Sequence, residues 1–230
     1  MGGGEVTVMY NVDVVFCIDV TQSMHPYLES VKQRALEFHA LLKADMLARK
    51  KGVDEIRVRV VAFRDLGHEG PDAVEASRFY KLPEDSEPFA AFVADLKPIG
   101  GGDDPESGLE ALAVAIRSPW QRDRPRRRHV IVMCTDAPAH PLGKFEMRRH
   151  GQEAAWPTTM AGLHAMWGDS ADEGEMELKS KRLLLFTPDC TPWSGIAESW
   201  ENNIAVPSPA GAGLRDAEMA EVIDIIAGSI

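Results

Sequence analysis

The fold of this chain is decided by residues 12–23, which read VDVVFCIDVTQS. Residues 12–18 are apolar apart from Asp13. A near-continuous apolar run predicts a strand that is covered on both faces, as in a parallel sheet between two layers of helices. Asp19 follows the run, and two hydroxyl residues come after it at alternating positions. Oxygen ligands therefore stand where a buried strand should end.

The remainder of the chain alternates between strand and helix patterns. A helix should begin near His25, because apolar residues then recur at steps of three and four and form one buried stripe: Leu28, Val31, Ala35, Phe38 and Leu42. The Gly-rich loop at 100–104 should open another helix, with Asp103 or Asp104 as its N-cap and Pro105 as its first residue. Further helices are expected near 89–96, 150–166, 196–200 and 214–226.

The expected strands after the first lie at 56–63, 78–82, 129–135, 183–187 and 203–206. Only a turn-rich stretch separates the strands at 56–63 and 78–82, so these two should pair antiparallel at an edge. The sequence thus predicts a three-layer α/β/α, doubly wound, Rossmann-like fold whose sheet is mostly parallel with one antiparallel edge strand. One domain should span residues 1–230, with a core at about 12–206 and a C-terminal helix at about 214–228.

Composition narrows the function classes. The net charge of -11 argues against nucleic-acid binding, which needs a basic surface. Cys17, Cys134 and Cys190 are widely spaced, which is typical of core thiols in a reducing compartment. No apolar run is long enough for a membrane span, and residues 1–5 lack the basic start of a secretory signal. We therefore expect a cytoplasmic protein without a membrane segment.

Three separated segments each place oxygen ligands at a strand end or in a loop. The first holds Asp19, Thr21 and Ser23, the second holds Asp103 and Asp104, and the third is the Thr-Asp-Ala-Pro segment that contains Asp136. Ligands collect at the carboxyl ends of strands in open parallel sheets. Mg²⁺ prefers six oxygen ligands and retains some water. The segments together predict one metal site, although each could instead be a helix cap or a turn.

The Asp19-x-Thr21-x-Ser23 motif resembles the metal-ion-dependent adhesion site of von Willebrand factor type A domains. In that family the motif follows the first strand, a Thr comes from a Gly-rich loop, and an Asp follows the fourth strand. Here Asp136 takes the last role, and Asp103 or Asp104 replaces the loop Thr. The loop variants, together with Phe63-Arg64-Asp65, are similar to those of the alpha-kinase-associated branch and of related bacterial type A domains. The resemblance covers roughly residues 12–206.

The resemblance implies a binding module and no enzymatic activity. Asp19, Thr21, Ser23, Asp103 and Asp136 would hold Mg²⁺ or Mn²⁺, with Ca²⁺ less suited. A partner protein would supply an Asp or Glu to the ion, and the domain would act as a scaffold or regulatory subunit of an intracellular assembly. The resemblance also implies that a shift of the last helix could couple to metal occupancy. The oligomeric state stays open.

Two residues near the expected site have two interpretations each. His140 could contact a ligand at the same sheet edge or belong to the architecture of its loop. Asp65 ends the second expected strand, and it could support the site or be an ordinary turn residue. Four tryptophans in the later half should lie in the core, unless exposure makes them part of an interface: Trp156, Trp167, Trp193 and Trp200.

Two other functions compete with the binding module. A Mg²⁺-dependent phosphohydrolase would use Asp19 as nucleophile, with Asp136 and Asp103 on the metal. Thr21 stands where haloacid-dehalogenase-like enzymes carry a second Asp, and Lys144 is the nearest candidate for their Lys. The other alternative is a metal-free domain in which these residues serve only as caps.

Overall fold

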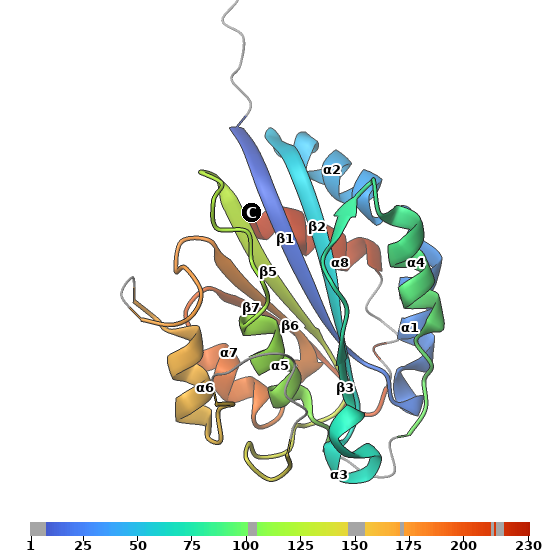
Figure 1. Ribbon diagram of the computed structural model, residues 1–230, viewed down its shortest axis with the longest axis vertical. Helices are drawn as coiled ribbons and strands as arrows, with labels where there is room; N and C mark the ends of the chain where they lie inside the picture. The colour runs from blue at the N-terminus through green and yellow to red at the C-terminus, as the bar shows by residue number, and fades with distance from the viewer. Residues whose placement is uncertain (1–7, 101–104, 147–154, 171–172, 213, 215–218) are drawn as a thin grey trace, which may run out of the picture.

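The computed structural model describes residues 8–100, 105–146, 155–170, 173–212, 214 and 219–230 (Figure 1). Within these residues the strands form one sheet in the order β3-β2-β1-β5-β6-β7, and β4 also pairs with β2. The strands are β1 (Val8–Asp19), β2 (Lys51–Phe63), β3 (Val74–Ala76), β4 (Tyr80–Leu82), β5 (Arg127–Cys134), β6 (Lys181–Pro188) and β7 (Asn203–Ser208).

The sheet is mostly parallel, as the sequence predicts. β1 runs parallel to both β2 and β5, and β5-β6 and β6-β7 are parallel pairs as well. The antiparallel edge is confirmed by β4, which pairs with residues 56–58 of β2. β3 was not predicted as a separate strand, and it pairs antiparallel with residues 61–63 at the same edge.

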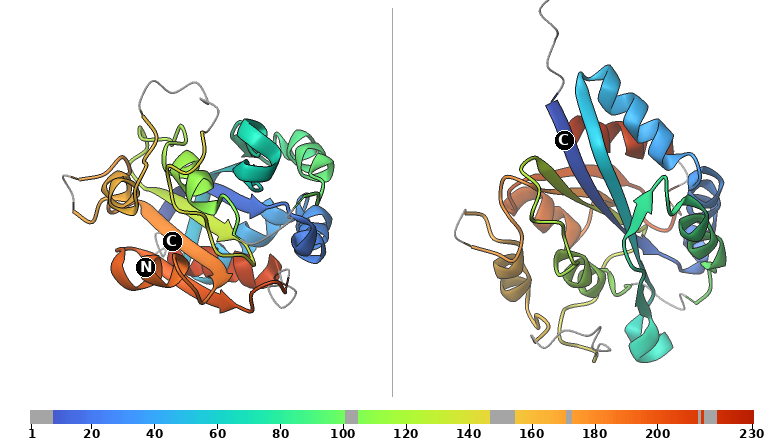
Figure 2. Two further views of the ribbon diagram at one scale, coloured as in Figure 1. Left: turned by 90° about the horizontal axis from the view of Figure 1, so that it is seen from below. Right: turned by 45° about the horizontal axis from the view of Figure 1, so that its top comes forward.

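Helices cover both faces of the sheet (Figures 1 and 2). One face packs against α1 (His25–Arg34), α2 (Phe38–Ala48), α4 (Ser86–Asp95) and α8 (Met219–Ser229). The other face packs against α5 (Gly108–Ile116), α6 (Met160–Trp167) and α7 (Trp193–Ser199). The short elements η1 (Gln22–Met24), α3 (Leu66–Glu69) and η2 (Gly70–Asp72) lie in connections.

The two cores follow from the alternation of side chains along β1. Phe16 and Ile18 point into the core beneath α1 and α8, whereas Val15 and Cys17 point into the core beneath α5. Every residue of α5 is buried, so this helix is enclosed on all sides. A strand and a helix that are buried all round explain the long apolar runs in the sequence.

Several predicted helix boundaries were wrong. The stripe predicted from Leu28 to Leu42 is buried as expected, but it is shared by α1 and α2, which a turn at residues 35–37 separates. The helix after the Gly-rich loop begins at Gly108, not at Pro105. α6 begins only at Met160, where Thr159 accepts a hydrogen bond from the Gly162 N–H as N-cap. In the predicted last helix, Leu214 has a positive φ of 48° and α8 begins at Met219.

The chain order places a switch point between β1 and β5. From β1 the chain moves to β2 on one side, and β5 then returns to the other side of β1. Neighbouring connections leave the sheet in opposite directions at such a point, which opens a crevice at the carboxyl ends of the two strands. Asp19 is the last residue of β1, and Thr135 directly follows β5.

The cysteines and the helices of the structure relate to the expectations from composition. Cys17 and Cys134 are buried free thiols in β1 and β5, which confirms their interpretation as core residues. Among the described residues, no helix combines the length and the apolar character that a membrane span requires.

Candidate metal centre

Asp19 is completely buried at the carboxyl end of β1. Its Oδ1 accepts hydrogen bonds from the Thr21 hydroxyl at 2.6 Å and from the Thr21 N–H at 2.9 Å. Its Oδ2 accepts a hydrogen bond from the Thr135 hydroxyl at 2.7 Å. Hydroxyls from two separate loops therefore hold both oxygens of this carboxylate in place.

Ser23 connects this cluster to the second carboxylate. The Ser23 hydroxyl donates to Asp136 Oδ1 at 2.9 Å, and its oxygen lies 3.4 Å from the Thr21 hydroxyl. Asp136 is only 1% exposed, whereas Ser23 is exposed to solvent. The structure therefore brings Asp19, Thr21, Ser23 and Asp136 together, and the exposed member of the set is Ser23.

The helix-cap interpretation of the first segment does not hold for its hydroxyls. Thr21 is the N-cap residue of η1, yet its side chain makes no capping hydrogen bond. The N-cap of α1 is Met24, again without a side-chain cap. Because Thr21 and Ser23 bond to carboxylates and not to helix N–H groups, local helix capping does not account for them.

Thr135 was missed as a site residue. Its hydroxyl donates to Asp19 and accepts a hydrogen bond from the Ala137 N–H at 3.1 Å, so it holds the loop after β5 against β1. The available signal was its position directly before Asp136, at the end of a strand beside β1. In that segment only Asp136 was assigned to the site.

Burial dominates the electrostatics of Asp19. The pKa of this carboxyl is raised from 3.8 to about 6, because burial and the nearby Asp136 raise it by more than the hydrogen bonds from Thr21 and Thr135 lower it. No basic side chain from the described residues is among these influences. The site thus holds a buried acid whose negative charge has hydroxyl donors but no cationic partner, a state that costs free energy.

The residues on either side of the Gly-rich segment contact loops of the same cluster. Asp103 and Asp104 themselves lie outside the described residues. On one side of the gap, the Gly100 carbonyl accepts from the Gln22 N–H at 3.4 Å. On the other side, Glu106 pairs with Ala139 and its N–H donates to the Pro138 carbonyl at 2.9 Å. Both ends of the segment therefore border the loops that carry Thr21 and Asp136.

Asp65 and His140 contact each other. Asp65 caps α3 by accepting the Gly67 N–H at 2.8 Å, and its Oδ1 lies 3.1 Å from His140 Nε2. His140 Nδ1 is 3.3 Å from Lys144 Nζ, so the lysine weighed for phosphohydrolase chemistry contacts His140. Asp65 is therefore the N-cap of α3, and it also contacts the loop of His140.

The profile of a protein family described as von Willebrand factor A domain matches residues 13–147, which is more than half of the chain. The matched range includes β1 from residue 13 onward, β2, α5, β5 and the whole cluster around Asp19 and Asp136. The chain belongs to the von Willebrand factor A domain family. Its parallel sheet, its flanking helices and its switch point agree with this assignment.

One relative of the von Willebrand factor A domain is the alpha-protein kinase vwkA of Dictyostelium discoideum. It is 26% identical over 129 residues, which cover 56% of this chain and 19% of the kinase. The chain therefore spans about a fifth of that protein.

The chain is also similar to solved structures at low sequence identity, and the first of the two below has the same fold. One structure of the pilus adhesin SpaC from Lactobacillus rhamnosus GG gives a TM-score of 0.50 at 10% identity, over 93% of this chain and 30% of the adhesin. The vWF domain of the pilus tip protein Mfa5 from Porphyromonas gingivalis gives 0.38 at 22% identity, over 62% of this chain and 43% of Mfa5.

The oxygen atoms that surround Asp19 and Asp136 in this von Willebrand factor A domain are suitable ligands for a hard divalent ion. The described residues bring together no group of three or more His, Cys, Asp or Glu side chains that could hold a metal. They do bring together two carboxylates and three hydroxyls, all with oxygen donors: Asp19, Asp136, Thr21, Ser23 and Thr135. Such a set suits Mg²⁺ or Mn²⁺ better than softer ions, and it leaves ligand positions for water.

Proposed function

We propose that this von Willebrand factor A domain is a metal-dependent protein-interaction module. Domains of this family typically serve in interaction or adhesion, and the fold neighbours include adhesins. The observation that carries the proposal is the hydroxyl chain between two buried carboxylates, in which Thr21 contacts Asp19 and Ser23 contacts Asp136. It lies at the switch point of the sheet, where ligands of parallel sheets bind.

The hydroxyls of Thr21 and Ser23 would hold the ion directly. Asp19 and Asp136 would hold it directly or through water, and Asp103 or Asp104 would complete the set from the Gly-rich segment. The ion would be Mg²⁺ or Mn²⁺, with Ca²⁺ less suited. When bound, the ion supplies a positive charge that retains affinity for one more anionic ligand. The cost of the buried, cation-free Asp19 carboxylate supports this assignment, because an ion would offset it.

A partner carboxylate is the ligand that this site suits. Ser23 is exposed while Asp19 and Asp136 are buried, so approach from solvent leads to the hydroxyl end of the set. The net charge of -11 would repel an acidic partner at long range. An Asp or Glu of a partner protein would therefore be recognised only when the ion is present. The ion would thus provide both the contact with the partner and the selectivity for a carboxylate.

The proposed cellular role rests on the branch of the family that the sequence resembles. We propose that this domain is a scaffold or regulatory subunit of an intracellular, cytoplasmic assembly that involves neither nucleic acid nor membrane. The alignment with an alpha-protein kinase supports the alpha-kinase-associated branch. Kinase activity is not part of the proposal, because the aligned residues cover 19% of that protein.

Isothermal titration of Mg²⁺ and Mn²⁺ into EDTA-stripped protein tests the proposal. The wild type should bind one ion, and Asp19→Ala should abolish binding while the far-UV circular dichroism is unchanged. Asp189→Ala is the matched control, because Asp189 is an exposed acid that directly follows β6 at the same sheet edge. Equal binding by wild type and Asp19→Ala, or equal loss in the Asp189 control, would refute the assigned site.

A further inference from the structure

A groove lies between α6 and α7, and none of the residues that line it belongs to the cluster around Asp19. Its volume is about 330 Å³, against about 10 and 40 Å³ for two other cavities of the described chain. Ligand pockets commonly measure roughly 300–1,000 Å³. The groove therefore has room for a side chain with its neighbours, and it needs an explanation of its own.

Small residues edge the groove and large ones form its base. Ala161 on α6, with Gly195 and Ser199 on α7, line it and are exposed. Ile196 and Trp200 line it as well and are buried. A Cβ added at Gly195 would meet nothing within 4 Å, so the space beside this helix is open. Because the residues at the edge of the groove are small and its base is apolar, the backbone of a partner can approach closely, as in helix-in-groove recognition.

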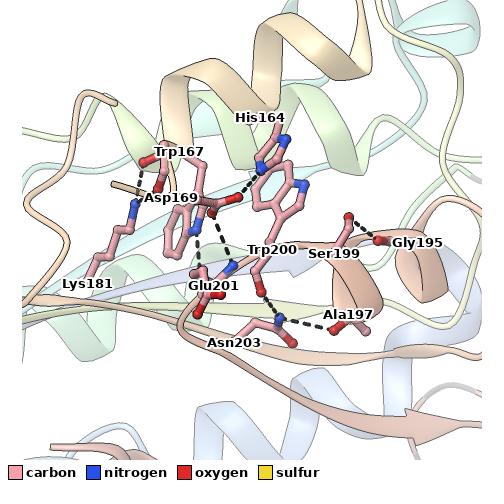
Figure 3. Close-up of polar contacts among 11 residues, drawn as sticks. His164, Trp167, Asp169, Lys181, Gly195, Ala197, Ser199, Trp200, Glu201 and Asn203 are labelled. Atoms are coloured by element: carbon pink, nitrogen blue, oxygen red, sulfur yellow. Dashed lines mark hydrogen bonds and ion pairs between the residues drawn. The ribbon is translucent and has the colours of Figure 1, made fainter. Parts of the chain in front are cut away.

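A stack of rings makes the end of the groove rigid (Figure 3). The His164 ring lies on the Trp200 ring, with centroids 5.3 Å apart and planes 10° apart. Trp200 stacks in turn on Trp167 at 5.8 Å, and the Trp167 Nε1–H donates to the Glu201 carbonyl at 3.0 Å. Rigid aromatic walls lose little entropy on binding, which is why such residues dominate interface energetics.

Asp169 sets the orientation of the His164 ring. Its Oδ2 lies 2.6 Å from His164 Nε2, and its Oδ1 accepts the Glu201 N–H at 3.1 Å (Figure 3). In the neutral tautomer whose Nε2–H donates to this carboxylate, Nδ1 is an acceptor. Nδ1 makes no hydrogen bond with the described residues, and the side chain is 39% exposed. The groove thus offers an oriented acceptor to an incoming donor.

The segments that carry α6 and α7 bear charge of one sign, and the nearby cation Lys181 of β6 is buried, where it donates to the Trp167 and Gly168 carbonyls. Segments 155–170 and 188–203, which carry α6 and α7, contain no Lys or Arg. They contain the acids Asp169, Asp189, Glu198 and Glu201. Glu198 and Glu201 flank the groove residues Ser199 and Trp200 in sequence and are exposed. An apolar base beside acidic and acceptor groups is complementary to a cation that adjoins an apolar side chain.

We propose that the groove between α6 and α7 binds a basic peptide segment of a partner protein, in which an aliphatic or aromatic anchor adjoins Lys or Arg. The anchor occupies the space beside Gly195 and Ile196, and the cation lies toward Asp169, Glu201 and His164 Nδ1. This surface shares no lining residue with the metal site. It gives the domain a second partner whose charge is opposite to that of the carboxylate partner.

Selection from a phage library of random 12-residue peptides on immobilised wild type tests the proposal, followed by fluorescence anisotropy of the enriched peptides. Gly195→Leu fills the groove with little risk to the fold, because the position is open and leucine favours a helix over glycine. Gly228→Leu is the matched control, since Gly228 also faces open space but lies on α8. Glu198→Lys combined with Glu201→Lys tests the charge.

Enriched peptides should pair an apolar residue with Lys or Arg and bind the wild type equally with Mg²⁺ or EDTA. Gly195→Leu and the double lysine variant should each weaken binding by about tenfold or more, and Gly228→Leu should not change it. Acidic consensus peptides, peptides that bind Gly195→Leu as tightly as wild type, or no enrichment would overturn the proposal. A wild-type dimer that Gly195→Leu dissociates would assign the groove to a second copy of the chain and would also overturn it.

Discussion

The Ser23 hydroxyl donates a 2.9 Å hydrogen bond to Asp136 Oδ1 and so joins two loops that are 113 residues apart in the chain. Ser23 belongs to the loop after β1, and Asp136 to the loop after β5. Because β1 and β5 are parallel neighbours, the two loops leave the sheet at the same edge. The site is therefore a product of topology, with each strand delivering one carboxylate to the switch point.

Metal should stabilise the wild type and not Asp19→Asn. A ligand that binds only the folded state adds about 2.7 kcal/mol at a concentration of 100 times its Kd. The Asn variant keeps the side-chain shape and an acceptor oxygen but loses the charge of Asp19. Thermal unfolding with EDTA and with excess Mg²⁺ measures the difference. An equal shift of Tm in both proteins would locate the metal elsewhere.

Ser23→Ala should separate metal affinity from stability. The side chain is exposed, so loss of its hydrogen bond to Asp136 should cost no more than about 1 kcal/mol of unfolding free energy. Metal affinity should fall roughly tenfold, which corresponds to about 1.4 kcal/mol. Gln22→Ala, an exposed neighbour, serves as the control. Unfolding in urea and Mn²⁺ titration give the two quantities, and unchanged Mn²⁺ affinity would remove Ser23 from the ligand set.

Gly108→Ala should destabilise the domain near the site. A Cβ at Gly108 would lie 2.8 Å from an atom of the Trp193 ring, and overpacking of this kind costs about 1–3 kcal/mol. The Trp193 Nε1–H donates at 2.9 Å to the Ala137 carbonyl, next to Asp136, so the displacement should also weaken metal binding. Gly195→Ala faces open space and should be neutral or stabilising. Urea unfolding of both variants measures the two changes in stability. Equal changes in the two variants would contradict the prediction.

Glu110 should make stability depend on pH. The residue is 2% exposed, neither carboxylate oxygen has a hydrogen bond to another of the described residues, and burial raises its pKa from 4.5 to about 7. A raised pKa carries no penalty below pH 4.5, where both states are protonated. The penalty grows as pH rises toward 7 and is complete above it.

Glu110→Gln removes this titration while it conserves shape. The variant should gain stability over wild type between pH 4.5 and 8, by an amount on the order of 3 kcal/mol at most. Urea unfolding at several pH values measures the difference between the two proteins, which cancels the titration of groups they share. A difference that does not vary with pH would show that Glu110 titrates normally.

Much of this architecture could be predicted from the sequence, because strands such as β1 and β5 are marked by apolar runs that end in an acid. Parallel neighbours then bring Asp19 and Asp136 to one edge without further information. Non-local contacts explain what could not be predicted. Glu106 pairs with Ala139, and the Ser107 hydroxyl accepts the Leu66 N–H at 3.0 Å, so α5 starts later than its Pro and Asp residues suggest.

A continuous apolar pattern in the sequence can also hide the point where one helix ends and the next begins. The apolar stripe from Leu28 to Leu42 runs through the turn between α1 and α2, because both helices bury the same face against the sheet. The role of Thr135 in the site could not be predicted from the local sequence either. Its role depends on the distance to Asp19, a residue that lies 116 positions earlier in the chain.

The most direct test of the metal site is a crystal structure of the Mn²⁺-soaked protein with anomalous diffraction data at the manganese edge. We predict one anomalous peak in contact with the Ser23 and Thr21 hydroxyls, between Asp19 and Asp136, and no such peak in Asp19→Ala. A peak at any other place on the wild type, or no peak in crystals whose site is open to solvent, would contradict this prediction.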